Sequence, residues 1–216
     1  TTTAIVKDGE SFEVWFDASS GQVVNSVRLE GPYNTVNCST STVPGNWTYD
    51  IVSGNKYDTR ITVTVPSSAP ADRYELVLST SSGTERSPGS VKVVKNYKNE
   101  YYVMHMSDAH RAQGGYDETH TLRKVSEIVK ISNIIGPEIL IETGDNQYNI
   151  DFGDSKRDTR LDKYFNGIAS QDIWGMHNTS ATTFMCAGNH DDPDNTYNGD
   201  AAGTADWVEL YNPMSF

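Results

Sequence analysis

Three short apolar runs in the second half of the chain alternate with two segments of helical periodicity, and this alternation limits the fold more than any other feature. The apolar runs cover residues 101–106, 139–141 and 182–186. Apolar residues recur at helical spacing in 118–134 and 155–169. A strand–helix–strand–helix–strand order predicts parallel strands joined by right-handed crossovers. Ligand sites in such sheets lie at the carboxyl ends of the strands.

The first half of the chain has the pattern of an all-β domain. Short runs rich in Val, Ile, Thr, Tyr and Trp alternate with polar residues and are separated by Gly, Pro, Asn and Ser. About seven short strands at this spacing are typical of a β-sandwich of the immunoglobulin or fibronectin III type. A polar stretch at 95–99 marks the change of pattern, so we predict one domain in residues 1–97 and another in 98–216. The clearest strand candidates are 11–16, 23–29, 47–52, 60–65, 74–78 and 91–94.

A polar motif follows each of the three apolar runs in the second half. The motifs are Asp-X-His at 108–110, Gly-Asp at 144–145 and Gly-Asn-His-Asp at 188–191. Because parallel strands bring their carboxyl ends to one edge, we expect two carboxylates, an amide oxygen and two imidazoles to converge there. This set of donors suits Fe, Mn or Zn ions. The glycines before Asp145 and Asn189 allow the backbone to turn sharply and to approach the site closely.

The ordered set of Asp-X-His, Gly-Asp and Gly-Asn-His-Asp resembles the calcineurin-like metallophosphoesterase superfamily, which includes purple acid phosphatases, nucleotidases and phosphodiesterases. The resemblance covers residues 101–216, because 207–216 is similar to the segment that follows the third motif in many members. The all-β domain in front is an architectural similarity to the purple acid phosphatases. The resemblance implies an α/β sandwich, of which this chain holds the βαβαβ portion and lacks the C-terminal part.

The resemblance implies a set of metal ligands, residue by residue. Asp108 and His110 would bind the first of two metal ions. Asp145 would bridge the two ions, and Asn189 would bind the second through its side-chain oxygen. The ions are divalent or trivalent, and Mn, Fe and Zn all stay open. Tyr148 lies where purple acid phosphatases have a metal-binding tyrosine, but those enzymes lack the His of Asp-X-His. We therefore favour Tyr148 as a residue of the site wall, and its role as a metal ligand stays the alternative.

The resemblance also implies two catalytic residues. His190 would lie beside the leaving group as a general acid or transition-state stabiliser. Asp191 would orient His190. Two metal ions lower the pKa of a bridging water and clamp the phosphoryl oxygens, and the resulting hydroxide attacks phosphorus in line. The sequence thus predicts a metal-dependent phosphoric ester hydrolase that acts on a phosphorylated small molecule or a phosphodiester.

The three motifs supply only part of the ligand set that the family uses. Its members add histidines from a second half, usually one isolated His and a Gly-His-X-His motif, and this sequence has no such motif. We therefore expect a partner, namely the missing C-terminal half of the catalytic domain, and we expect the 216-residue chain alone to be inactive. The alternative is a secreted or surface binding protein with a non-catalytic phosphoesterase-like domain. The intact motifs favour the hydrolase.

Charge and cysteine content narrow the remaining function classes. The formal net charge of -12 disfavours dedicated binding of nucleic acid. No run approaches the roughly 20 apolar residues that cross a bilayer, so we expect no transmembrane segment. The low cysteine content, the many Ser, Thr, Asn and Gly residues and the start at Thr1 without Met together favour an extracellular, cell-surface or periplasmic location, and the three N-glycosylation sequons add little weight. Cys38 and Cys186 lie in different predicted domains and are expected to be free, buried thiols.

Overall fold

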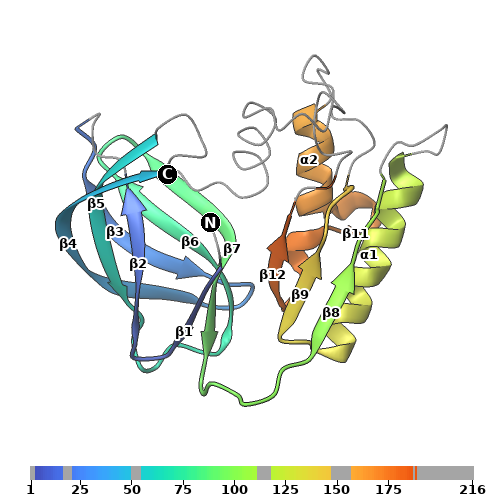
Figure 1. Cartoon of the computed structure of the whole chain (residues 1–216), viewed down its shortest axis with the longest axis horizontal. Coiled ribbons are helices and arrows are strands. Elements are labelled where there is room, and N and C mark those ends of the chain that lie inside the picture. Colours follow the sequence, from blue (N-terminus) through green and yellow to red (C-terminus); the bar gives the residue numbers. More distant parts are fainter. Residues whose placement is uncertain are drawn as a thin grey trace. The chain divides into compact units, whose positions relative to one another are not determined.

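The computed structural model describes residues 3–16, 21–49, 55–110, 118–146, 157–186 and 188. These residues form two units, and the boundary between the units lies between Asn99 and Glu100. The first unit is built of β-strands, and the second contains a small parallel sheet with helices, as Figure 1 shows.

The first unit is one seven-stranded sheet in the order β1-β7-β6-β3-β4-β5-β2. Its neighbouring strands are antiparallel, except for the parallel pair of β1 and β7. Strands β1 and β2, at the two ends of this order, contact each other, so the sheet curls into a nearly closed barrel. The strands are β1 Ala4–Lys7, β2 Ser11–Phe16, β3 Val24–Glu30, β4 Thr35–Tyr49, β5 Asn55–Thr64, β6 Asp72–Thr80 and β7 Thr84–Val94.

The length of β4 keeps this sheet continuous. The first residues of β4, 35–38, pair with β3, and residues 39–49 pair with β5. The prediction of an all-β first half is confirmed, but the predicted sandwich of two sheets is instead a single sheet joined through β4. Pro44-Gly45 is a turn signal in the sequence, yet the strand continues past it with a shift of register between Pro44 and Trp47. Proline has no N–H to donate to a neighbouring strand, and a bulge at this point allows the strand to continue past it.

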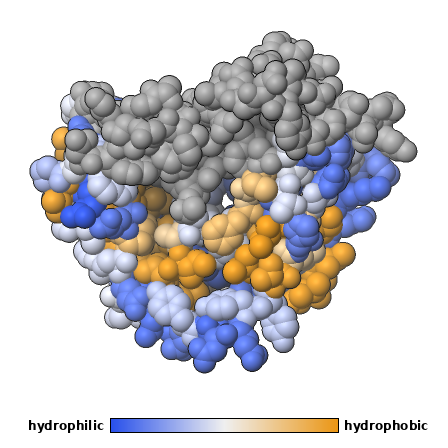
Figure 2. All heavy atoms as spheres, in the orientation of Figure 1, coloured by the Kyte–Doolittle hydropathy of each residue, from blue (hydrophilic) through white to orange (hydrophobic). Residues whose placement is uncertain are grey.

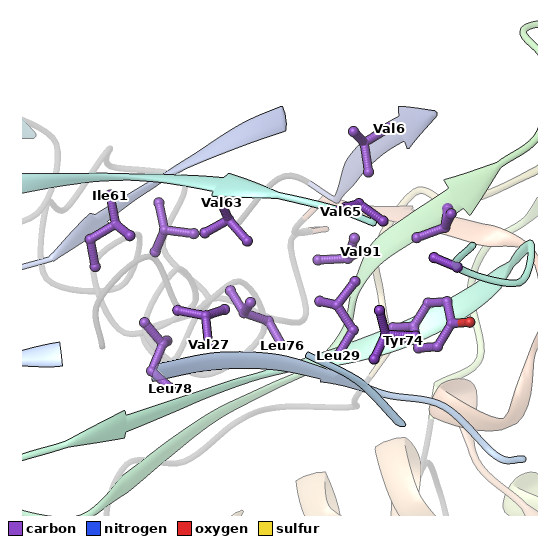
Figure 3. Close-up of a cluster of buried hydrophobic side chains, with 14 of the residues drawn as sticks. Val6, Val27, Leu29, Ile61, Val63, Val65, Tyr74, Leu76, Leu78 and Val91 are labelled. Carbon is purple, nitrogen blue, oxygen red and sulfur yellow. The ribbon is translucent and has the colours of Figure 1, made fainter. Parts of the chain in front are cut away.

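The core of the first unit lies inside this curled sheet. Ile61 and Val63 of β5 point toward Val27 of β3 and Leu78 of β6 in Figure 3, and none of the four is more than 1% exposed. The side chains of this core cluster occupy alternate positions along their strands, as Tyr74, Leu76 and Leu78 do in β6, because successive residues of a strand point to opposite faces. The period-2 pattern of the sequence therefore sets which residues form this core.

The second unit has three parallel strands in the order β12-β9-β8. The predicted alternation of strands and helices is confirmed within the described residues. The sequence gives no sign of the two-stranded antiparallel pair and the two 3-10 turns that lie between α2 and β12. The elements are β8 Val103–Met106, α1 Glu118–Ile135, β9 Ile139–Glu142, α2 Arg157–Asn166, β10 Gly167–Ile168, η1 Ala169–Gln171, β11 Ile173–Trp174, η2 Met176–Asn178 and β12 Thr182–Met185.

One face of this three-stranded sheet packs against the two helices. Leu140 in the central strand lies in one apolar cluster with Val125 and Val129 of α1 and Tyr164 of α2, and all four are buried. Hydrophobic residues are also exposed over β8 and α1 in Figure 2, and Ile134 near the end of α1 is 85% exposed. Among the described helices, none combines the length and the hydropathy that crossing a membrane requires.

The two cysteines form no disulfide and differ in exposure. Cys38 lies in β4, packs against the core of the first unit and is half-buried, whereas Cys186 follows β12 and is exposed. The prediction of free thiols is confirmed, but the prediction of burial is wrong for Cys186, since that residue lies just past the end of its strand. Burial raises the pKa of the Cys38 thiol to about 11.

Iodoacetamide at pH 8 is therefore expected to alkylate Cys186 well before Cys38. A pKa of about 11, against an ordinary value of 9.0, lowers the reactive thiolate fraction of Cys38. Two pKa units correspond to roughly 100-fold less thiolate at this pH. Mass spectrometry of the two cysteine peptides over time measures both rates. Equal rates in the folded protein would contradict this expectation, and equal rates in guanidinium are the control.

Candidate metal centre

Backbone hydrogen bonds continue the pairing of β8 and β9 beyond the ends of both strands. Thr143 N–H donates to the Met106 carbonyl at 3.1 Å, and Asp108 N–H donates to the Gly144 carbonyl at 3.0 Å. His110 N–H donates to the carbonyl of the next residue, Asp145, at 2.8 Å. These bonds hold the first two motifs side by side, as their position after adjacent parallel strands predicts.

The backbone at these motifs adopts conformations that most side chains avoid. Asp108, His110 and Asp145 have φ values of 59°, 43° and 55°, and only one other non-glycine residue in the described parts of the chain has a positive φ. Asp and His tolerate this left-handed region better than most residues do. Gly144 has φ 96°, a conformation that favours glycine. Backbone strain of this kind gathers at functional sites, where the surrounding structure holds it in place.

The side chains of Asp108, His110 and Asp145 converge on one point. One ligand atom from each lies within 4.8 Å of the other two. His110 Nε2 is 3.3 Å from Asp108 Oδ1 and 3.6 Å from Asp145 Oδ2. Ligands at about 2.1 Å from an ion, at tetrahedral or octahedral angles, stand about 3.0–3.4 Å apart. Two carboxylates and an imidazole at this spacing fit a divalent transition metal.

The three side chains differ in their access to solvent. The side chains of His110 and Asp145 are 19% and 15% exposed, whereas that of Asp108 is 64% exposed. The side chains of His110 and Asp145 are therefore largely buried, whereas that of Asp108 is exposed. Such a site is accessible from solvent on the Asp108 side.

A buried polar network supports the loop that carries Asp145. The Glu142 side chain, at the end of β9, accepts hydrogen bonds from Gly144 N–H at 3.1 Å and from the Asn146 side-chain amide at 2.6 Å. The Tyr164 hydroxyl of α2 donates to the other side-chain atom of Asn146, its Oδ1. Glu142, Asn146 and Tyr164 are all 0% exposed. A buried network of this kind fixes the loop on both sides of Asp145.

None of the sequence motifs predicts this network. One residue in the sequence does indicate such a network. Glu142 is acidic and stands at the end of an otherwise apolar strand, directly before Thr-Gly-Asp. Buried carboxylates need partners, so such a residue indicates a buried polar cluster beneath the strand end. Tyr164 gives no signal of its own, because its helical spacing is equally that of a core residue.

The start of the third motif lies directly against the second. A Cβ atom placed on Gly188 would be 2.4 Å from the backbone nitrogen of Asp145 and 2.2 Å from its Oδ1. The preceding strand leads to this contact, since Cys186 N–H donates to the Glu142 carbonyl at 3.0 Å. Gly188 is thus required for close approach of two backbones, as its position before Asn189 predicts.

The remaining predicted site residues lie outside the described residues. These are Asn189, His190 and Asp191 of the third motif, together with Tyr148 after the second. The described part of the site therefore comprises three side chains that could hold one ion.

Comparisons with known proteins add little to this picture. No family model matches the sequence, and no curated protein matches it significantly. A solved structure of the glucan utilization protein SGBP-B from Bacteroides ovatus, in complex with a mixed-linkage heptasaccharide, is 18% identical and covers 52% of this chain and 24% of that chain, with a TM-score of 0.30. An amylomaltase from Corynebacterium glutamicum is 14% identical and covers 65% of this chain and 20% of that chain, with a TM-score of 0.31. Similarities at this level carry no argument about function.

Proposed function

We propose that this chain contains the first part of a metal-dependent phosphoric ester hydrolase of the calcineurin-like type, preceded by an accessory all-β domain. One observation carries the proposal. Asp108, His110 and Asp145, from two motifs far apart in the sequence, lie within 4.8 Å of one another after adjacent parallel strands. The contact of Gly188 with Asp145 supports it, because Gly188 is the first residue of the third motif.

The resemblance to the calcineurin-like family assigns the residues that would hold the metal ions. Asp108 and His110 would hold the first ion, Asp145 would be a ligand of both ions, and Asn189 would hold the second. When bound, such ions supply an acidic water and neutralise the phosphoryl oxygens at the site. The identity of the pair is Mn, Fe or Zn, since carboxylate and imidazole ligands suit all three.

The other residues of the chain position the ligands and move a proton. Glu142 and Asn146 hold the loop around Asp145 through their hydrogen bonds. In hydrolysis the oxygen of water bonds to phosphorus and the phosphorus–oxygen bond to the alcohol breaks. The departing alcohol oxygen takes a proton from His190, and the proton that the water loses passes to solvent. Asp191 orients the His190 ring for this transfer.

The proposal is tested by metal-dependent binding of phosphate, which does not require turnover. Isothermal titration of the chain with Mn²⁺, and then with inorganic phosphate, is expected to show both binding events. His110→Ala should abolish them, whereas His177→Ala should keep them. His177 is a matched control because its ring stacks on Phe165 and contacts Asn166 rather than the metal ligands.

Two results of these titrations would contradict the proposed function. One is the absence of Mn²⁺, Zn²⁺ and Fe²⁺ binding, and the other is phosphate binding that persists in EDTA. Turnover of 4-nitrophenyl phosphate or its bis ester by a protein that joins this sequence to the further histidine ligands then separates a hydrolase from a non-catalytic binding protein. Loss of that turnover in His190→Ala would support the role given to His190.

A further inference from the structure

A cavity of about 340 Å³ lies beside the metal centre, between the end of β8 and helix α1. Residues 106–110 line one side, and this side includes the metal ligands Asp108 and His110. Thr121, Lys124, Val125 and Ile128 line the other side together with the neighbouring His120. Residues spaced by three, four and seven positions share one face of a helix, so α1 presents a continuous stripe to this cavity. We call the cavity the α1 groove, and Figure 1 shows β8 next to α1.

The floor of the α1 groove is apolar. Met106 and Val125 are 7% and 2% exposed, and Ala109 and Ile128 are half-buried. Pockets for small molecules have volumes of about 300–1,000 Å³, so this groove has room for a small organic group beside a phosphate and not for a polymer. An apolar floor next to a metal centre favours the carbon part of a small phosphate ester.

The side of the groove formed by α1 carries cationic and donor groups. Lys124 is exposed, and it pairs with no carboxylate among the described residues. By contrast, Lys130 on the same helix forms an ion pair with Asp172 at 2.8 Å. His120, in the first turn of α1, lines the groove beside Lys124. In a chain of net charge -12, an unneutralised lysine in a groove next to a metal centre favours an anionic ligand.

We propose that the α1 groove binds the alcohol part of the substrate, and that this part is a short carbon chain with a second anionic group that pairs with Lys124. The inference rests on the proposed function, because the phosphate must lie at Asp108, His110 and Asp145 for its alcohol part to enter the groove. The second anionic group is a carboxylate or a phosphate, which share the charge that Lys124 recognises. The substrate class is then a small phosphate ester with two separate negative groups.

Two phosphonates of matched length test this inference without being hydrolysed. Propylphosphonate has one anionic group, and 3-phosphonopropionate adds a carboxylate at the other end of a short carbon chain. Isothermal titration of the Mn²⁺-loaded chain is expected to give about fivefold tighter binding of 3-phosphonopropionate, since a partly exposed ion pair contributes up to about 1 kcal/mol. Lys124→Met should remove this preference and leave the affinity for propylphosphonate within about twofold.

Arg123→Met is the matched control, because Arg123 is an exposed cation on α1 that does not line the groove. This variant should keep the fivefold preference. Equal binding of the two phosphonates by the unmodified chain would overturn the inference, and so would a preference that survives in Lys124→Met. Either result, with inorganic phosphate still bound in a metal-dependent way, leaves the proposed function standing. Absence of metal-dependent phosphate binding would overturn both the proposed function and the inference about the α1 groove.

Discussion

Replacing Asp145 with asparagine is expected to lower the affinity of the chain for Mn²⁺ by at least about 100-fold. Mutation of a residue that only supports a metal ligand costs about 10–100-fold in affinity, and loss of a ligand itself should cost at least the upper value. The substitution removes one carboxylate oxygen that lies 3.6 Å from His110 Nε2. Asparagine tolerates the left-handed backbone at this position, where φ is 55°. The loss should therefore come from the missing charge and ligand atom, and not from a rebuilt loop.

Thermal unfolding measures the loss of metal binding in Asp145→Asn independently of titration. Metal at about 100 times its Kd adds about 2.7 kcal/mol to the stability of the unit that binds it. For a unit of roughly 100 residues this corresponds to a rise in Tm of about 10 °C. Asp145→Asn is expected to lose this rise, while its Tm without metal stays within a few degrees of the original, because two neighbouring carboxylates no longer repel each other.

Asp172→Asn is the matched control for Asp145→Asn. Asp172 also has a left-handed backbone, with φ 54°, but its side chain pairs with Lys130 instead of facing the metal ligands. This variant should bind Mn²⁺ with unchanged affinity and keep the metal-dependent rise in Tm. If both variants bind metal as tightly as the unmodified chain, the assignment of Asp145 as a metal ligand is wrong.

Replacing Gly188 with alanine is expected to destabilise the second unit and weaken metal binding together. The added methyl carbon would lie 2.4 Å from Asp145 N and 2.7 Å from its Cγ. Backbone atoms cannot rotate away as a side chain can, so the third motif or the Asp145 loop must move. Overpacking of this kind costs about 1–3 kcal/mol, and the displaced ligand should lower metal affinity by about 10-fold.

Urea unfolding of the second unit and Mn²⁺ titration measure the two effects of Gly188→Ala separately. Cys186→Ala is the control in the same segment, because Cys186 is exposed and the change removes an atom instead of adding one. The control should leave stability within about 0.5 kcal/mol of the original. Unchanged stability and unchanged metal affinity in Gly188→Ala would mean that the third motif does not approach Asp145 as described.

The convergence of Asp108 and Asp145 was predictable from the sequence because chain direction alone brings them together. Each follows an apolar run that predicts a strand, and parallel strands end at one edge. The residues that hold the loop were not predictable in the same way. Tyr164 and Asn146 are 18 positions apart and meet only because α2 packs on the helix face of the sheet.

The sequence by itself determined that the first half is built of strands, that strands and helices alternate in the second half, and that Asp108 and Asp145 follow adjacent parallel strands. Each of these follows from a local period or from the order of elements along the chain. Only the tertiary structure decided that β4 joins the first unit into a single sheet. The pairing partners of a strand lie far from it in the sequence, and no local pattern identifies them. It likewise decided that Lys124 lines a groove beside Asp108, since this depends on which face of α1 turns toward β8.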